Sequence, residues 1–245
     1  MSELAELVSA ARKIVAFTGA GVSTLSGIRD FRGKNGVYNA PWHGYNVEEI
    51  LSLDCFSRQP ELFYEWAKEF VYRLDDYRPG AMHLALAHLE SIGKLPGGVY
   101  TQNIDMLHQK AGSSKVYEIH GSPSMHHCLR GRHPLPYAAV APLVMADEVP
   151  RCPLCGGVVK PDIVFYGENL DEALLERGFE EFANCDLALA MGSSLTVYPA
   201  AALPEAAARH GVATVIINEQ QTHLDDHAVL RLESLEAAAE ELAAI

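Results

Sequence analysis

The sequence predicts an α/β fold in which a doubly wound, Rossmann-like parallel sheet carries a smaller inserted domain. Short apolar runs, such as residues 14–17 and 186–191, alternate with segments of helical periodicity, as in parallel sheets covered by helices on both faces. Several of these runs end in glycine or polar residues, which suits turns at a sheet edge. Residues 122–158 differ in composition, with clustered cysteine, histidine and proline, and this change indicates the insertion.

Length and composition indicate a globular protein without nucleic-acid or membrane partners. With 245 residues, 49% apolar and 21% charged, the chain can bury a full core. Its net charge of −13 argues against nucleic-acid binding, which depends on Lys and Arg, and mildly favours basic partners. The acidic N-terminus lacks the basic region of a secretory signal, and the longest apolar segment, residues 138–146, is too short for a membrane span. We expect a cytoplasmic protein whose five cysteines serve as thiols or metal ligands.

A glycine turn follows the first predicted strand and precedes a predicted helix start. Gly19 and Gly21 would let the backbone approach a bulky anion, and the free N–H groups of the helix start would receive a pyrophosphate. Thr24 replaces the third glycine of a G-x-G-x-x-G dinucleotide motif, so the turn alone is also consistent with a plain strand-to-helix connection. The same stretch then offers a hydrogen-bond acceptor, a flat ring and a phosphate partner in Asp30, Phe31 and Arg32.

Residues 19–33 resemble the cofactor-binding segment of the sirtuins, the Sir2 family of NAD-dependent protein deacylases, in its bacterial or archaeal form. Four further motifs described below match sirtuin motifs in the same order, down to Asn218. The resemblance implies NAD as the cofactor and acetylated lysine-containing proteins or peptides as the partners. In this first segment it assigns cofactor binding to Gly19, Ala20, Gly21, Ser23, Asp30, Phe31 and Arg32.

A loop and two helices are predicted next. Residues 34–54 lack clear periodicity, and we expect a loop over the cofactor, whereas residues 60–74 and 83–91 have the apolar spacing of helices. Sirtuins that remove succinyl or malonyl groups carry a tyrosine and an arginine on the first of these helices, and an ungapped comparison places Ala67 and Phe70 there. Because an apolar pocket would leave an acyl carboxylate unpaired, the resemblance favours acetyl or a longer apolar acyl chain.

Polar residues follow the predicted strand at residues 97–101. At the carboxyl edge of an open parallel sheet such residues bind ligands, although capping of the next helix is an alternative. Residues 101–105 with Leu107 and His108 resemble a sirtuin signature. The resemblance implies that Asn103 and Asp105 line a nicotinamide pocket, with Asn103 also catalytic, and that Gln102 contacts the ribose. The cofactor residues of this segment are Gln102, Asn103, Ile104 and Asp105.

His120 is the candidate catalytic base. It ends a predicted strand at residues 116–121, so it emerges at the same sheet edge as Gln102. Histidine accepts a proton near neutral pH, although a lone histidine is more often structural. In the sirtuin pattern the pair formed by His120 and Gly121 supplies the base.

The insertion is predicted to be a zinc ribbon, with Cys128, Cys152 and Cys155 as ligands. Sirtuins carry two C-x-x-C pairs here, but Gly131 stands where the second cysteine of the first pair is expected. The fourth ligand would then come from one of three nearby histidines or from water, or the site would be weak or empty. The family uses this zinc for structure. The three histidines are His126, His127 and His133.

Residues 161–168 are predicted to form a strand that resembles the sirtuin segment pairing with the substrate peptide backbone. The resemblance implies that Val164 and Phe165 wall a narrow apolar tunnel and that Gly167 and Glu168 flank the peptide. The alternative is that residues 161–168 form only another strand of the hydrophobic core.

Two more buried strands, residues 186–191 and 212–217, end in residues suited to phosphate and ribose. The segments that follow these two strands match sirtuin motifs. No residue of this sequence is matched to the adenine contact of the sirtuins. The cofactor residues here are Gly192, Ser193, Ser194, Asn218 and Glu219.

We therefore expect an NAD-binding domain formed by residues 1–33, 80–122 and 158–245. Residues 34–79 would form the cofactor loop and the helical part of the small domain, and residues 123–157 its zinc-ribbon part. The resemblance implies an NAD-dependent protein-lysine deacetylase that yields nicotinamide, O-acetyl-ADP-ribose and free lysine. A protein ADP-ribosyltransferase, or a non-catalytic sensor of NAD or ADP-ribose, is the alternative.

Overall fold

The large sheet is parallel and six-stranded in the computed structural model, which describes residues 2–33 and 36–245. Residue 1, and residues 34 and 35 of the predicted cofactor loop, lie outside the described residues. The first strand lies inside the sheet, hydrogen-bonded to a strand on either side. Across the sheet the order is β3 (Val116–Glu118), β2 (Val99–Thr101), β1 (Ile14–Thr18), β7 (Leu187–Met191), β8 (Ala213–Ile217) and β9 (Leu230–Leu232).

Residues of β1 alternate between two hydrophobic cores, one on each face of the sheet. Ile14 and Ala16 belong to one core, and Val15 and Phe17 belong to the other. Because successive side chains of a strand point to opposite faces, a strand covered on both faces is apolar throughout. The prediction of a doubly wound fold is confirmed. The first core includes α1 (Glu3–Ala10), α6 (Ala81–Ser91) and α11 (Leu235–Ala243), and the second includes α9 (Glu172–Ala183) and α10 (Ala202–Arg209).

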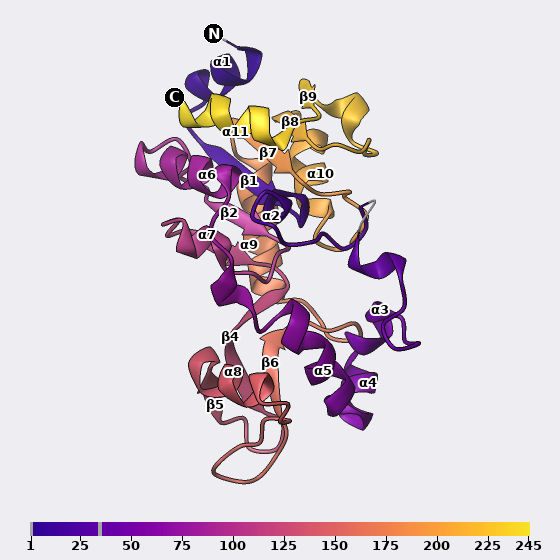
Figure 1. The fold of residues 1–245 in the computed structure, drawn as a ribbon. Coiled ribbons are helices and arrows are strands. Elements are labelled where there is room, and N and C mark those ends of the chain that lie inside the picture. Colours follow the sequence, from indigo (N-terminus) through magenta and orange to yellow (C-terminus); the bar gives the residue numbers. More distant parts are fainter. Residues whose placement is uncertain (1, 34–35) are drawn as a thin grey trace.

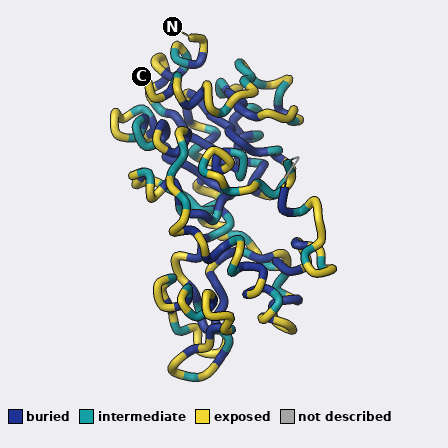
Figure 2. Tube along the Cα trace, in the orientation of Figure 1, coloured by how far each residue is buried: buried dark blue, intermediate teal, exposed yellow. Residues whose placement is uncertain are grey.

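The inserted part has its own antiparallel sheet and its own aromatic core. It lies below the large sheet in Figure 1, and Figure 2 shows buried segments running through it. Phe56, Phe63, Trp66 and Phe165 pack together in this core. The sheet order is β5 (Pro134–Pro136), β4 (Gly121–Cys128) and β6 (Val159–Ile163), and the helices are α3 (Val47–Ile50), α4 (Leu53–Arg58), α5 (Pro60–Phe70) and α8 (Tyr137–Met145).

Several predicted elements differ in extent. The predicted loop at residues 34–54 contains α3 and the start of α4, because its apolar residues Val47 and Ile50 are buried in the small core. The predicted helix at residues 60–74 ends at Phe70, and the predicted strand at residues 161–168 ends at Ile163. The strand predicted at residues 116–121 is divided, because β3 ends at Glu118 and β4 starts at Gly121. The short helices are α2 (Gly21–Thr24), α7 (Leu107–Lys110) and the 3₁₀ turns Val37–Asn39, Leu74–Asp76 and Asp225–His227.

The predicted domain boundaries stay a prediction. Strand β6, which they place with the NAD-binding domain, pairs with β4 in the small sheet. Within the described part of the chain, no helix has the length and apolarity needed to cross a membrane.

The turns after β1 and β7 touch through glycine backbone. The N–H of Gly19 donates to Met191 O, and that of Gly21 to Gly192 O, both at 2.9 Å. A Cβ on Gly19 would lie 2.6 Å from Gly192 O, which real side chains do not tolerate. The glycines therefore let two turns of the protein meet, whereas the sequence predicted room for an anion. The N–H of Gly21, expected to be free for a phosphate, is used within the chain.

We expect Gly192→Ala to destabilise the protein by at least about 3 kcal/mol, because a Cβ there would lie 2.4 Å from Val22 N and Gly192 has φ +60°. Gly211→Ala is the matched control, since Gly211 has φ +73° and open space around it. It should cost only about 1 kcal/mol, the strain of the left-handed conformation. Urea unfolding of both variants measures the difference. Equal costs would show that the contact between the turns contributes little.

Candidate active site

A cleft of about 560 Å³ lies at the carboxyl ends of the parallel strands. Segments that follow strands of the large sheet line it, together with the segment that follows β6 of the small sheet. Cavities of this size hold cofactors and small ligands. Most of the residues expected at a site line it. They are Ala20, Gly21, Asp30, Phe31, Arg32, Gln102, Asn103, Ile104, His120, Val164, Phe165, Gly167, Glu168, Gly192, Ser193, Ser194, Asn218 and Glu219.

Three expected cofactor residues, Gly19, Ser23 and Asp105, do not line the cleft but support Asn103, which does. The side-chain amide of Asn103 donates to Gly19 O and to Ser23 Oγ, each at 3.0 Å. Ser23 Oγ in turn donates to Asp105 Oδ2 at 2.6 Å, and the other carboxylate oxygen accepts from Leu107 N. Because every member is buried and bonded, this network fixes the amide of Asn103 in one orientation.

His120 is a neutral imidazole held by one main-chain contact. Its Nδ1 lies 3.0 Å from Gln102 O, and since a carbonyl oxygen only accepts, Nδ1 carries the hydrogen. Nε2 is then the basic nitrogen. Burial lowers the pKa of His120, and the hydrogen bond to Gln102 opposes this only in part. A neutral histidine in a ligand-sized cleft can accept a proton at neutral pH.

The side chain of Gln102 carries a donor that the protein leaves unused. Its Oε1 accepts from Ser193 Oγ at 2.9 Å, which orients the amide. Its Nε2 is buried and has no partner among the described residues. An unpaired buried donor is costly, so a ligand with a hydroxyl oxygen in this position would gain affinity. This donor and the cleft volume fit a dinucleotide such as NAD.

Arg32 has other partners than the phosphate expected from the sequence. Its Nη2 lies 3.0 Å from Glu48 Oε1 and 3.5 Å from the hydroxyl of Tyr166, and its guanidinium lies over the ring of Tyr38. Glu48 belongs to α3, within the segment predicted to be a loop. Arg32 therefore links this segment to the loop after β6.

The apolar wall of the cleft includes Val164 and Phe165, as expected, together with Trp66 and Ile104. Ala67 and Phe70, the positions compared with the acyl-carboxylate pair of some sirtuins, are not among the described residues that line it. Of the three described residues, only Trp66 lines the cleft from α5, so the apolar character of Ala67 and Phe70 says nothing about the acyl group. Trp66 was assigned to the core alone, and its 1% exposure explains why periodicity could not single it out.

Glu168, expected to flank a peptide, is bonded within the chain. Its Oε2 lies 2.8 Å from Lys160 Nζ and accepts from Phe165 N at 2.8 Å. Lys160 is itself buried, and burial lowers its pKa while Glu168 raises it. The pair fixes the turn that carries Phe165.

Sequence reasoning missed several residues that line the cleft from loops. Nothing in their spacing sets them apart, because they reach the cleft only through the folding of the loops. They include Tyr38, Leu51, Tyr166, Tyr198 and Gln220.

A second constellation, in the inserted part, can hold a metal ion. The donor atoms of Cys128, His133, Cys152 and Cys155 all lie within 4.8 Å of one another. Three thiolates and one imidazole suit a structural, tetrahedral zinc site. The fourth ligand left open by the sequence is therefore His133.

Gly131 makes room for that histidine. A Cβ on Gly131 would lie 2.4 Å from the His133 ring, so a side chain in the place of the missing cysteine would exclude His133. The other two candidate histidines are engaged elsewhere: His126 Nε2 lies 2.7 Å from the hydroxyl of Tyr72, and His127 Nδ1 lies 2.6 Å from Asp162 Oδ1.

Comparisons with known proteins agree with this geometry. Residues 19–199 match the model of the Sir2 family. The chain is 40% identical over 231 residues to the NAD-dependent protein deacetylase of Thermotoga maritima, covering 94% of this chain and 92% of the relative. It is 40% identical to NAD-dependent protein deacylase 2 of Archaeoglobus fulgidus, covering 90% and 85%.

Solved structures give the same result. A Sir2 complex with a deacetylated p53 peptide and 3′-O-acetyl ADP-ribose is similar, with a TM-score of 0.90 at 38% identity, covering 98% of this chain and 96% of that one. A Sir2 complex with a p53 peptide and NAD⁺ has a TM-score of 0.87 at 38% identity, covering 99% and 95%.

We expect His133→Ala to lower zinc affinity by more than the roughly 10–100-fold that loss of a supporting residue costs, because it removes one of four ligands. Gly131→Ala should also weaken binding by displacing the His133 ring. His127→Ala, which removes a histidine bonded to Asp162, is the control and should bind zinc as the parent does. Competition with a chromogenic chelator measures the affinities. Unchanged affinity in His133→Ala would assign the fourth position to another ligand.

Proposed function

The chain belongs to the Sir2 family, and we propose that it removes acetyl and other apolar acyl groups from protein lysines in an NAD-dependent reaction. It is an NAD-dependent protein deacetylase, as its relatives are named. The products are nicotinamide, O-acetyl-ADP-ribose and free lysine. The observation that carries the proposal is the neutral His120, with its basic nitrogen free, in the same cleft as the glycine turns.

NAD binds across the carboxyl edge of the sheet in this proposal. Bound NAD supplies the leaving nicotinamide and the ribose hydroxyls that receive the acyl group. The unused donor of Gln102 binds a ribose hydroxyl, and Asn103, fixed by the Ser23 and Asp105 network, orients the nicotinamide end. Phe31 covers that end of the cleft and excludes water from it.

His120 acts as the general base. Its Nδ1 keeps its hydrogen and donates it to Gln102 O, so Nε2 accepts the proton of a ribose hydroxyl as that hydroxyl takes over the acyl group. The imidazolium so formed keeps the Gln102 carbonyl as a hydrogen-bond acceptor. The main chain thus stabilises the charge that develops on the base.

The acyl-lysine enters along the apolar wall. Val164, Phe165, Trp66 and Ile104 line this part of the cleft, and an acyl carboxylate would be desolvated there without a partner. This supports acetyl and longer apolar chains over succinyl. The peptide backbone lies along Val164 and Gly167, and the Lys160–Glu168 pair holds the turn between them.

The zinc has a structural role in this proposal. Its ligands lie in the inserted part, apart from the residues that line the cleft. We also propose a cytoplasmic location, since three zinc-binding thiolates require a reducing compartment.

We expect nicotinamide release from NAD with acetyl-lysine and myristoyl-lysine peptides of one sequence, and little with the succinyl-lysine peptide. His120→Ala should lower the rate by roughly 10²–10⁴-fold, because it removes the general base. His88→Ala, a histidine of α6 outside the cleft, is the control and should leave the rate unchanged. Release measured by chromatography gives all three results.

Other outcomes would favour the alternatives. Transfer of ADP-ribose to protein that persists in His120→Ala while deacylation is lost would indicate an ADP-ribosyltransferase. Tight ADP-ribose binding without nicotinamide release from any acyl peptide would indicate a sensor.

A further inference from the structure

The wall of the cleft where α9 and α10 begin is not used by the reaction chemistry. Helix α9 ends just before β7 starts and α10 follows β7, so both helices begin at the carboxyl edge of the sheet. They are in close contact, because a Cβ on Gly178 of α9 would lie 2.9 Å from Leu203 Cδ2 of α10. Glu172 is the first residue of α9 and Tyr198 lies just before α10, and both line the cleft. The two side chains therefore belong to one wall.

The carboxylate of Glu172 has no partner within the described part of the chain. Glu172 is exposed, and α9 is capped by Asp171 instead, whose carboxylate accepts from Leu174 N at 3.0 Å. Of the described residues that line the cleft, Arg32 is the only lysine or arginine, and it is paired with Glu48. The start of α9 therefore carries a negative charge that the rest of the cleft does not offset.

The ring of Tyr198 is fixed beside this charge through its hydroxyl. The hydroxyl donates to Glu205 Oε1 in α10, and the same oxygen lies 2.8 Å from Nε2 of His223. The ring is open to a ligand, because Tyr198 is 58% exposed. Leu175 also lines the cleft, and it adjoins Glu172 because residues three positions apart share a helix face. The wall thus combines a carboxylate with an aromatic and an aliphatic surface.

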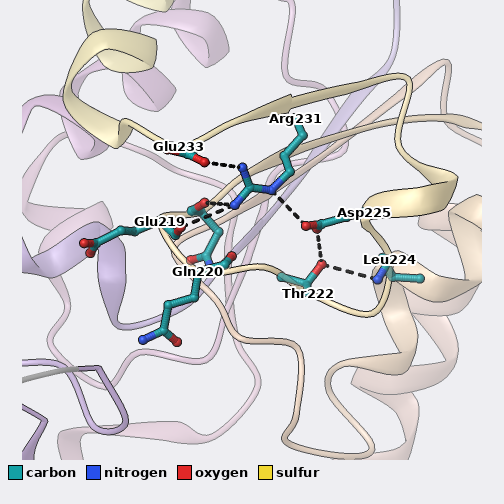
Figure 3. A network of polar contacts seen from close by, with 8 residues as sticks. Glu219, Gln220, Thr222, Leu224, Asp225, Arg231 and Glu233 are labelled. Carbon is teal, nitrogen blue, oxygen red and sulfur yellow. Dashed lines mark hydrogen bonds and ion pairs between the residues drawn. The ribbon is translucent and has the colours of Figure 1, made fainter.

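The loop after β8, which carries His223, is fixed by Arg231 (Figure 3). Nη2 of Arg231 donates to the carbonyl oxygens of Asn218 and Glu219, at 3.2 and 3.3 Å. Its Nε lies 2.8 Å from Asp225 Oδ2. The contacts that hold the tyrosine ring therefore rest on an ordered loop.

We propose that the protein prefers acyl-lysines that have a second, cationic side chain close by in the peptide, and that Glu172 and Tyr198 bind this side chain. Lysine and arginine lay their aliphatic stems along apolar surfaces while the charged end meets a carboxylate, and arginine also stacks on aromatic rings. Acylation neutralises the target lysine, so the carboxylate recognises another residue of the peptide.

The inference rests on the proposed function, because it requires an acyl peptide in the cleft. That proposal places the peptide backbone along Val164 and Gly167. Helix α9 begins a few residues after Gly167, so the wall described above adjoins the peptide.

The direct test compares KM values for peptides that differ in one residue. Each peptide contains one acetyl-lysine and, at one of the nearest positions on either side, arginine or glutamine. With saturating NAD, nicotinamide release by the parent should give a KM about fivefold lower for arginine at the best position. Addition of about 0.5 M NaCl should reduce this ratio, because salt screens an exposed ion pair.

Glu172→Gln should reduce the ratio to about twofold or less, since only the ring remains to bind arginine. Glu176→Gln is the matched control, because Glu176 is an exposed glutamate one turn further along α9 and is not among the described residues that line the cleft. It should keep the parent ratio, whereas a general attraction between an acidic protein and a basic peptide would fall equally in both variants. Tyr198→Leu should lower the ratio as well, because it removes the ring face.

The outcomes distinguish this inference from the proposed function. Equal KM values for arginine and glutamine at every position, or an equal loss in Glu172→Gln and Glu176→Gln, would overturn the inference and leave the proposed function standing. An unchanged ratio in Tyr198→Leu would overturn the part assigned to the ring. If none of the peptides supports nicotinamide release, both the inference and the proposed function fail.

Discussion

The contact between the turns after β1 and β7 is the constraint on which the rest of the structure depends. Gly19 and Gly21 donate their N–H groups to Met191 O and Gly192 O, and no side chain fits between these turns. Because β1 and β7 are thereby held together at their carboxyl ends, two glycines of these turns, Gly21 and Gly192, line the cleft without a side chain. A dinucleotide can then lie close to the sheet edge, beside Gln102 and Ser193, which are hydrogen-bonded to each other.

Polar groups around the cleft are bound before any ligand arrives. Asn103 is held by Gly19 O and Ser23, His120 by Gln102 O, and the loop after β8 by Arg231. Such preorganisation means that little reordering accompanies binding, so more of the binding free energy remains for positioning the reacting atoms. Burial lowers the pKa of His120, so the imidazole remains a base at neutral pH.

Much of the fold was predictable because its signals are local. Runs of buried residues such as those of β1 and β7 identify strands wherever they stand in the sequence, and polar residues after them identify the sheet edge. Contacts between distant segments have no such signal. The sequence predicted Asp105 as a residue of the nicotinamide pocket, yet its carboxylate accepts a hydrogen bond from Ser23. The choice of His133 as the fourth zinc ligand likewise depends on the space that Gly131 leaves for its ring. The pairing of Arg231 with two carbonyl oxygens likewise has no counterpart in spacing, because carbonyl groups are common to all residues.

The measurement that tests the central claim most directly is the pH dependence of kcat/KM for an acetyl-lysine peptide, with folding followed by circular dichroism at each pH. Burial lowers the pKa of His120 below its ordinary value of 6.5, so the imidazole is neutral above that pH and takes a proton only as the pH falls through the lowered value. The account predicts a constant kcat/KM well above pH 6.5 and a one-proton decrease, with its midpoint below pH 6.5, in the folded protein. A decrease already between pH 8 and 7 would contradict it, because the base would then have a raised pKa and could not be His120 in this setting.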